Sequence, residues 1–531
     1  MLKNSDAKIN RTDLYIRYLI IGLFLIHLIP IWCFKFIPTQ DGINHVYNAY
    51  ILKEYNNPNY TKYREVYDLN IRPFPNWTSH AFFFVALYVL PPLIAEKIFV
   101  TFCVVLVPLS FFYFMRSIDK KLWFFGFLGF LYSYNVLLHL GFYNFAISVP
   151  LYFFTVGYWW KNRTEMSRKN WIILNLLMMS LYFSHFFSFT WALVSIGLLT
   201  MTSVILSWDQ QKNYKERLMI LARSAIYFSP SLIVFLICGL INPEDRTKSY
   251  KPFKELLEYF LSVKSLVYYN DRYRPISWVL LGLMGFCLLL TIFVLLWHFF
   301  KAKMGNHRFY RIFLNQRLGF LLLAIVLTVL YFKIPWAYGP PAWLNDRANL
   351  FILPVLAGWF TFNYPKWLKI GTTAIIIILS LAHLGLTIYD YDLLNKDLKE
   401  LTAGVGLIKD NSTIGIVTDD FYSAPNHGTI KYLSPILHDT CYYCFGNGSH
   451  YIGNYEPKYV YFPLQYKFGY WKNKYQGITD YILLWQMNNK NIDVVQIVLE
   501  NTDIERFNLK DDYELILGTE YIKLFKHKSV K

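Results

Sequence analysis

The chain has 531 residues, of which 55% are apolar, 20% aromatic and only 16% charged, and its formal net charge is +17. This composition argues against an ordinary water-soluble protein and indicates several membrane-spanning helices. The charge does not indicate a nucleic-acid partner, because Lys and Arg gather in short loops between apolar runs, where they fit membrane topology and anionic lipid.

Eleven apolar segments approach or reach the length of about 20 residues that a helix needs to cross a bilayer. The first, 14–34, has one charged residue, Arg17, near its start and no small-residue cleavage site, so we expect a retained helix. The other ten are 93–115, 122–138, 145–160, 171–186, 188–207, 218–240, 276–300, 318–332, 348–363 and 368–388.

The basic residues between these segments predict their orientation. With the N-terminus inside, the inner loops carry Lys and Arg at about three times the density of the outer loops, as the positive-inside rule requires. The apolar stretch 77–90 is short and is bounded by prolines, and counting it as a span would turn every later basic loop outward. We therefore expect it to lie at the membrane interface within the first outer loop, 35–92.

The fold class expected is an α-helical polytopic membrane protein with about eleven transmembrane helices, the N-terminus inside and the C-terminus outside. Residues 1–389 would form the transmembrane domain, with interfacial helices at 43–55 and 77–90 in the first outer loop. Residues 390–531 would form a small soluble α/β domain on the outer side. Its β-rich runs, each bounded by turn signals, are Thr413–Thr418, Tyr459–Leu464, Val494–Leu499 and Tyr513–Phe525.

Polar residues gather at the outer ends of the predicted spans. Polar groups at membrane depth are costly and usually face a cavity or a partner, so several such groups on one side indicate a site. The arginines among them offer a planar fork that matches phosphate oxygens. The candidate substrate-binding residues are Asn44, His45, His80, His139, Asn144, His185, Arg246, Arg272 and Arg347.

Asp41, directly after the first predicted span, is the candidate catalytic residue. If 43–55 is a helix, Asp41 and His45 share one face, a turn apart. A carboxylate held there can act as a general base on a substrate anchored in lipid. Asp is also a favoured N-cap residue, and Gly42 follows, so Asp41 could simply cap the helix. The two roles are compatible, and the sequence leaves both open.

Four histidines on the predicted outer side, His45, His80, His139 and His185, could bind zinc or manganese together with Asp41. The sequence contains no HExxH or comparable ligand spacing, however, and histidines at aromatic-rich helix ends also serve as hydrogen-bonded core residues. We therefore assign no metal ligand. A divalent metal, Mg, Mn or Zn, stays open as a cofactor.

The position of Asp41 resembles that of the acidic residue in the GT-C superfamily of membrane glycosyltransferases, which lies in the first outer loop directly after the first transmembrane helix. Pro75-Asn76-Trp77 and Ala95-Glu96-Lys97 are similar to the corresponding stretch in bacterial members. The chain departs from the family at 139–144, His-Leu-Gly-Phe-Tyr-Asn, where a second acidic element is usual and no carboxylate occurs. An oligosaccharyltransferase-like mechanism that depends on a metal is therefore not expected.

The resemblance implies transfer of a sugar from a polyprenyl-phosphate-linked donor to a glycan, lipid or protein acceptor, at the outer face of a bacterial inner membrane. Asp41 would be the base and Arg347 would stabilise the phosphate. Two other classes stay open. A lipid-linked saccharide transporter or flippase would place polar residues near the membrane midplane. A non-catalytic envelope assembly subunit would tolerate replacement of Asp41 and Arg347.

Overall fold

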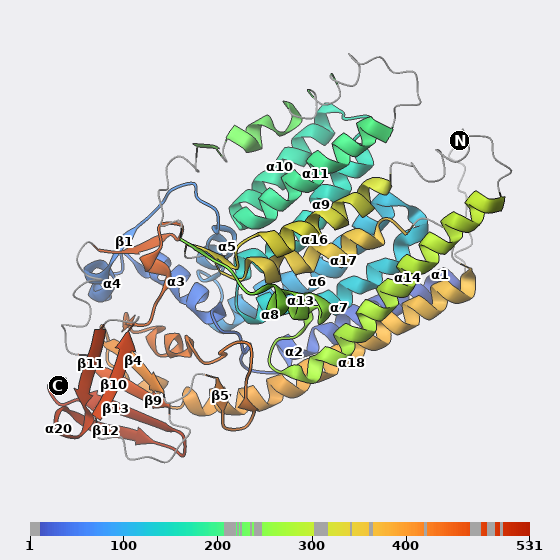
Figure 1. Ribbon diagram of the computed structural model, residues 1–531. Coiled ribbons are helices and arrows are strands. Elements are labelled where there is room, and N and C mark those ends of the chain that lie inside the picture. The colour runs from blue at the N-terminus through green and yellow to red at the C-terminus, as the bar shows by residue number, and fades with distance from the viewer. Residues whose placement is uncertain are drawn as a thin grey trace, which may run out of the picture.

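The structure is a computed structural model, and it describes residues 11–206, 247–301, 317–339, 342–360, 365–418, 422–467, 479–485, 494–499 and 503–530, with short stretches between 219 and 237. The described chain is mostly helical. A region rich in strands follows the last long helix and lies at one end of the helical bundle (Figure 1).

The first part of the chain contains both long and short helices. They are α1 (Arg11–His27), α2 (Ile29–Trp32), α3 (Gly42–Glu54), α4 (Thr61–Val66), α5 (Thr78–Ala86), α6 (Pro92–Ile118), α7 (Leu128–Tyr132), α8 (Val136–His139), α9 (Tyr143–Asn162), α10 (Arg168–Ser184) and α11 (Phe186–Leu206). The later α-helices are α13 (Phe253–Leu261), α14 (Arg274–Lys301), α16 (Leu318–Lys333), α17 (Leu344–Ala357), α18 (Lys366–Leu401) and α20 (Leu509–Asp512). Short 3₁₀ helices are η1 (Lys120–Phe127), η2 (Lys264–Leu266), η3 (Asp271–Tyr273), η4 (Val405–Leu407), η5 (Asp439–Cys444) and η6 (Glu456–Lys458).

Six helical segments of the described chain are long and apolar enough to cross a membrane. Helices also form at four further predicted spans, as α9, α10, α16 and α17, but these do not meet the same length and hydropathy. The remaining predicted span, 218–240, lies largely outside the described residues. The count of eleven therefore stays a prediction. The six segments are Leu14–Trp32, Pro92–Ile118, Lys120–His139, Phe186–Leu206, Asp271–Trp297 and Lys366–Leu407.

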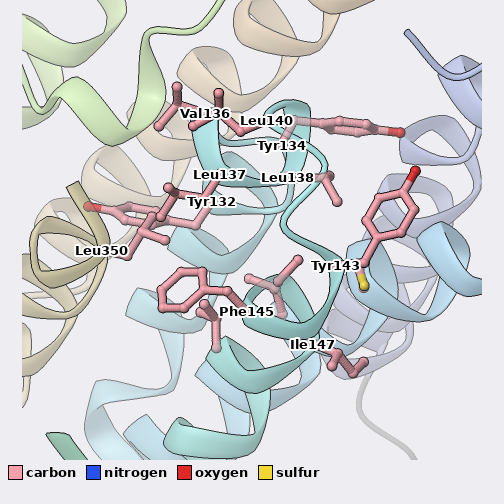
Figure 2. Close-up of a cluster of buried hydrophobic side chains, with 14 of the residues drawn as sticks. Tyr132, Tyr134, Val136, Leu137, Leu138, Leu140, Tyr143, Phe145, Ile147 and Leu350 are labelled. Atoms are coloured by element: carbon pink, nitrogen blue, oxygen red, sulfur yellow. The ribbon is translucent and has the colours of Figure 1, made fainter. Parts of the chain in front are cut away.

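The predicted span 122–138 is not one regular helix. It is built from η1, α7 and α8, and the helix breaks between α7 and α8. Asn135 restarts it, because its side-chain oxygen accepts the backbone N–H groups of Leu137 and Leu138, both at 3.1 Å. Buried aromatic and aliphatic side chains surround the break and the turn after it, among them Tyr134 and Tyr143 (Figure 2).

The turn after α8 packs against the segment that carries Asp41. Gln40 N–H donates to the carbonyl of His139 at 2.9 Å, and Asp41 N–H donates to that of Leu140 at 3.2 Å. Gly141 has φ +76°, and a Cβ atom there would collide with the backbone nitrogen of Gly42. Only glycine fits this backbone conformation and this approach without strain.

The Gly141→Ala variant should therefore have a free energy of unfolding about 1–3 kcal/mol lower than the wild type. Thermal unfolding in nanodiscs measures the change. Gly197→Ala is the matched control: Gly197 lies in α11 with no atom within 4 Å of the added Cβ. A loss of stability no larger in Gly141→Ala than in this control would contradict the close approach.

The C-terminal region contains a five-stranded sheet of order β12-β13-β9-β4-β7. β4 runs parallel to β7 and β9, whereas β13 is antiparallel to β9 and β12. All strands of the described chain are β1 (Tyr67–Leu69), β2 (Lys248–Ser249), β3 (Ala337–Tyr338), β4 (Thr413–Thr418), β5 (Ser423–Ala424), β6 (Gly428–Thr429), β7 (His450–Tyr451), β8 (Leu464–Tyr466), β9 (Tyr481–Trp485), β10 (Val494–Leu499), β11 (Asp503–Asn508), β12 (Tyr513–Gly518) and β13 (Ile522–His527).

Three of the four predicted β-runs are confirmed, with Tyr513–Phe525 forming the hairpin of β12 and β13. The prediction of a strand over Tyr459–Leu464 was wrong. These residues form turns and bends, and a strand begins only at Leu464. Pro457 precedes this run, and Pro463 lies within it. Proline has no backbone N–H to give to a ladder, which explains why the strand is delayed.

The first loop and the C-terminal segment pack together. β1, in the first loop, pairs antiparallel with β8, and Asn70 N–H donates to the carbonyl of Pro463 at 2.8 Å. The predicted helix 43–55 forms as α3, and most of its side chains are buried within the protein. The predicted boundary after residue 389 falls inside α18, which ends at Leu401.

Candidate functional site

A cavity of about 210 Å³ opens where several helix ends meet at one end of the bundle. Its lining comes from the starts of α3, α9 and α17 and from the turn before α11. The segment 455–462 from the C-terminal region closes the cavity. Its lining residues are Asp41, His45, Asn76, Phe142, Asn144, Phe145, His185, Ala342, Trp343, Arg347, Tyr455, Tyr459, Tyr461 and Phe462.

Asp41 occupies the N-cap position of α3, but its side chain makes no capping hydrogen bond. The carboxylate turns to the cavity, where Oδ1 accepts from Gln40 Nε2 at 3.2 Å and lies 3.6 Å from His438 Nε2. The residue is only 5% exposed. Asp41 therefore occupies the N-cap position without capping the helix through its side chain. The carboxylate is available for other chemistry.

The surroundings of Asp41 favour its neutral form. Burial, and to a smaller extent the negative charge of Glu456, raise the pKa of the carboxyl to about 7, against the opposing hydrogen bonds from Gln40 and Tyr455. His438 does not supply a compensating charge, because burial lowers its pKa to about 3. A carboxyl group with a pKa near neutrality can accept a proton from a substrate and release it again.

The Asp41→Asn variant should unfold at a higher temperature than the wild type at pH 8. An unfolded Asp ionises at its ordinary pKa of 3.8 and the folded one at about 7. Ionisation therefore destabilises the folded chain as the pH rises between these values, in total by about 4 kcal/mol. Asn carries no such penalty. Thermal unfolding from pH 4 to pH 8 measures the gap between the two proteins, which should widen as the pH rises. A gap that does not change with pH would contradict the raised pKa.

Arg347 and His185 also line the cavity. A guanidinium nitrogen of Arg347 lies 3.1 Å from His185 Nε2, and the guanidinium stacks near the ring of Phe142 at 4.9 Å. Arg347 Nε makes no hydrogen bond to the described residues. The neighbouring carboxylate of Asp346 does not satisfy it, since neither Asp346 oxygen makes a hydrogen bond there either. The guanidinium thus keeps a donor for an anionic ligand.

Asn144 lines the cavity and joins two helices beside it. Its Oδ1 accepts from Ser79 N–H at 2.8 Å, and its Nδ2 donates to the carbonyl of Asn76 at 2.9 Å. Asn44, one turn into α3, points elsewhere: its Oδ1 accepts a weak hydrogen bond from Cys441 Sγ at 3.4 Å. Asn44 is buried and is not a lining residue.

Two other predicted binding residues, His139 and Arg272, do not line this cavity. His139 stacks on Tyr268 with ring centroids 3.8 Å apart, and its Nδ1 bonds to the carbonyl of Asn135 at 2.9 Å. Arg272 forms an ion pair of 2.6 Å with Asp390 and lines a different, open cavity. Arg246 lies outside the described residues.

His45 and His80 both reach the carboxylate of Glu456. His45 Nδ1 lies 2.5 Å from Oε1, and His80 Nε2 lies 2.7 Å from Oε2. All three residues are buried, and their ligand atoms lie within 4.8 Å of one another. They are the one group of described residues with the geometry to hold a metal ion.

Sequence reasoning missed the contribution of the C-terminal region. His438, Tyr455 and Glu456 face Asp41 or its neighbours, and Tyr459 and Tyr461 line the cavity. The available signal was an acidic residue beside an aromatic-rich run, but that run was interpreted as a strand of a separate domain. Contacts between residues about 400 positions apart leave no local pattern in the sequence.

Neither protein-family models nor curated proteins give a match to this chain. The functional conclusion therefore depends on the cavity itself. A buried carboxylate and a guanidinium with a free donor line the same cavity, at the ends of helices in a chain with segments able to cross a membrane. Such a pair can activate a hydroxyl group and bind an anion at the same time.

Proposed function

We propose that this chain is a membrane glycosyltransferase of the GT-C type. It would transfer a sugar from a polyprenyl-phosphate-linked donor to a glycan, lipid or protein acceptor at the outer face of a bacterial inner membrane. The observation that supports this most is the Asp41 carboxylate, which is buried at a helix N-terminus, forms no cap there, and lines a cavity with Arg347.

The place of the cavity suits a lipid-linked donor. Asp41 follows one candidate membrane span, Leu14–Trp32, and precedes the next, Pro92–Ile118. The exposed side chains Val85, Tyr88 and Val89, at the end of α5, are apolar and fit contact with the membrane interface. In this proposal eleven helices span the membrane, with the N-terminus inside and the C-terminal region outside.

The proposed reaction uses Asp41 as the general base. It removes the proton of the acceptor hydroxyl, whose oxygen forms a bond to the anomeric carbon of the donor sugar. The bond between that carbon and the phosphate oxygen breaks, and its electron pair leaves with the polyprenyl phosphate. Arg347 stabilises the negative charge on this leaving group, because its guanidinium is held in place by His185 and keeps a free donor. A single base favours inversion at the anomeric carbon.

Asp41→Asn should reduce sugar transfer about 10²–10⁴-fold, the usual contribution of a general base. Purified chain in nanodiscs would be assayed with a panel of radiolabelled polyprenyl-phosphate sugars. Asp392→Asn, an exposed acid on α18, is the control and should keep full activity. A folded Asp41→Asn variant with normal turnover would remove Asp41 from the mechanism. A wild type that binds donor without turnover would favour a transporter or an assembly subunit.

Arg347→Ala should lower kcat about 10²–10³-fold, which is the typical effect of removing one group that stabilises transition-state charge. Arg163→Ala is the matched control, because Arg163 also stacks on an aromatic ring, that of Trp160, but follows the far end of α9. The same transfer assay measures both variants. Equal losses in the two would mean that Arg347 acts only through stability.

A further inference from the structure

His45, His80 and Glu456, here called the His–His–Glu group, come from three separate elements. His45 lies in α3, His80 in α5, and Glu456 in η6 of the C-terminal region. None of the three is more than 3% exposed. Such burial is costly for ionisable groups unless each has a partner that satisfies it.

Both histidines of this group contact one carboxylate closely. His45 Nδ1 and Glu456 Oε1 lie 2.5 Å apart, the distance of a tight ion pair. A carboxylate as buried as that of Glu456 needs a positive charge beside it. A metal ion held by both imidazoles and the carboxylate would supply that charge.

The second histidine has the arrangement of a metal ligand. His80 Nδ1 lies 3.2 Å from the carbonyl of Asn76, which can only accept a hydrogen bond, so Nδ1 carries the proton. In the neutral ring Nε2 then carries a lone pair, and this nitrogen lies 2.7 Å from Glu456 Oε2. A carbonyl that fixes the tautomer from behind is the usual support of a histidine bound to metal.

We propose that the His–His–Glu group binds a zinc ion, with water in the fourth position. Two imidazoles and one carboxylate suit zinc better than Mg²⁺ or Ca²⁺, which prefer oxygen ligands. Tetrahedral zinc with bonds of 2.0–2.2 Å needs ligand atoms about 3.4 Å apart, so the side chains would open slightly from their present contacts. The inference does not depend on the proposed function, because the site and its ion can be tested without turnover.

The zinc would fasten the first loop to the C-terminal region beside the cavity. His45 lines the cavity, and Tyr455, next to Glu456, hydrogen-bonds to Asp41. The three ligands would thus be positioning residues, which hold the wall that faces Asp41. The histidines His139 and His185, grouped with them by sequence, take no part: one stacks on Tyr268 and the other contacts Arg347.

The test is metal analysis of the full chain, purified in nanodiscs without chelator. We expect about one zinc per chain by mass spectrometry. After chelation, Co²⁺ should restore binding with the visible absorption bands of a tetrahedral site. Free zinc at 100 times its Kd should raise the folded-to-unfolded ratio about 100-fold, seen as a higher unfolding temperature.

Variants separate this site from adventitious binding. His80→Gln and Glu456→Gln should weaken zinc affinity at least about 100-fold. His427→Gln is the matched control, because His427 is also buried and paired with a carboxylate, that of Asp390, outside the group. Its zinc affinity should be that of the wild type.

Two results would overturn the proposal. One is a wild-type chain that takes up neither zinc nor Co²⁺ and whose unfolding temperature changes with neither zinc nor chelator. This result needs no variant, so it stands even if the substituted proteins fail to fold. The other is zinc uptake unchanged in a folded Glu456→Gln variant. Either result would make the group a buried cluster of side-chain contacts that holds no metal ion.

Discussion

The close approach of two backbone segments at Asp41 is the constraint on which the site depends. A Cβ atom on Gly141 would collide with the backbone of Asp41 and Gly42, and the backbone N–H of Asp41 donates to the carbonyl of Leu140. This contact fixes the start of α3. It also places a carboxylate where burial and Glu456 oppose its ionisation. The free energy lost by holding the charge there is typical of a functional site, since packing elsewhere must offset it.

The C-terminal region completes this site. Its strand β8 extends β1 of the first loop, Tyr47 OH donates to the carbonyl of Ser449 at 2.8 Å, and Glu456 lies between two histidines of the first loop. The cavity is therefore lined both by helix ends of the bundle and by residues that follow the last long helix. An acceptor or donor that enters it meets both parts, which gives the C-terminal region a direct part in the proposed selection of substrate.

Much of the helical framework could be predicted from apolar runs, because length and hydropathy are local properties. The polar side of the framework could be predicted too: Asp41, His45, Asn144, His185 and Arg347 do line one cavity. The partners of these residues could not. Glu456 lies more than 370 residues from His80 in sequence, and the aromatic run after it alternates like a strand although Pro457 and Pro463 prevent one. The packing of η5 on α3 could not be predicted either, because nothing in the sequence of α3 points to it.

The central claim is that the Asp41 cavity binds a sugar joined to a lipid phosphate. The most direct measurement is an electron cryomicroscopy structure of the full chain in nanodiscs with a polyprenyl phosphonate sugar, whose carbon link cannot be cleaved. The account predicts density for the phosphonate at Arg347 and for the sugar within reach of the Asp41 carboxylate. Density in the open cavity beside Arg272, or at the membrane midplane between the helices, with the Asp41 cavity empty, would contradict it.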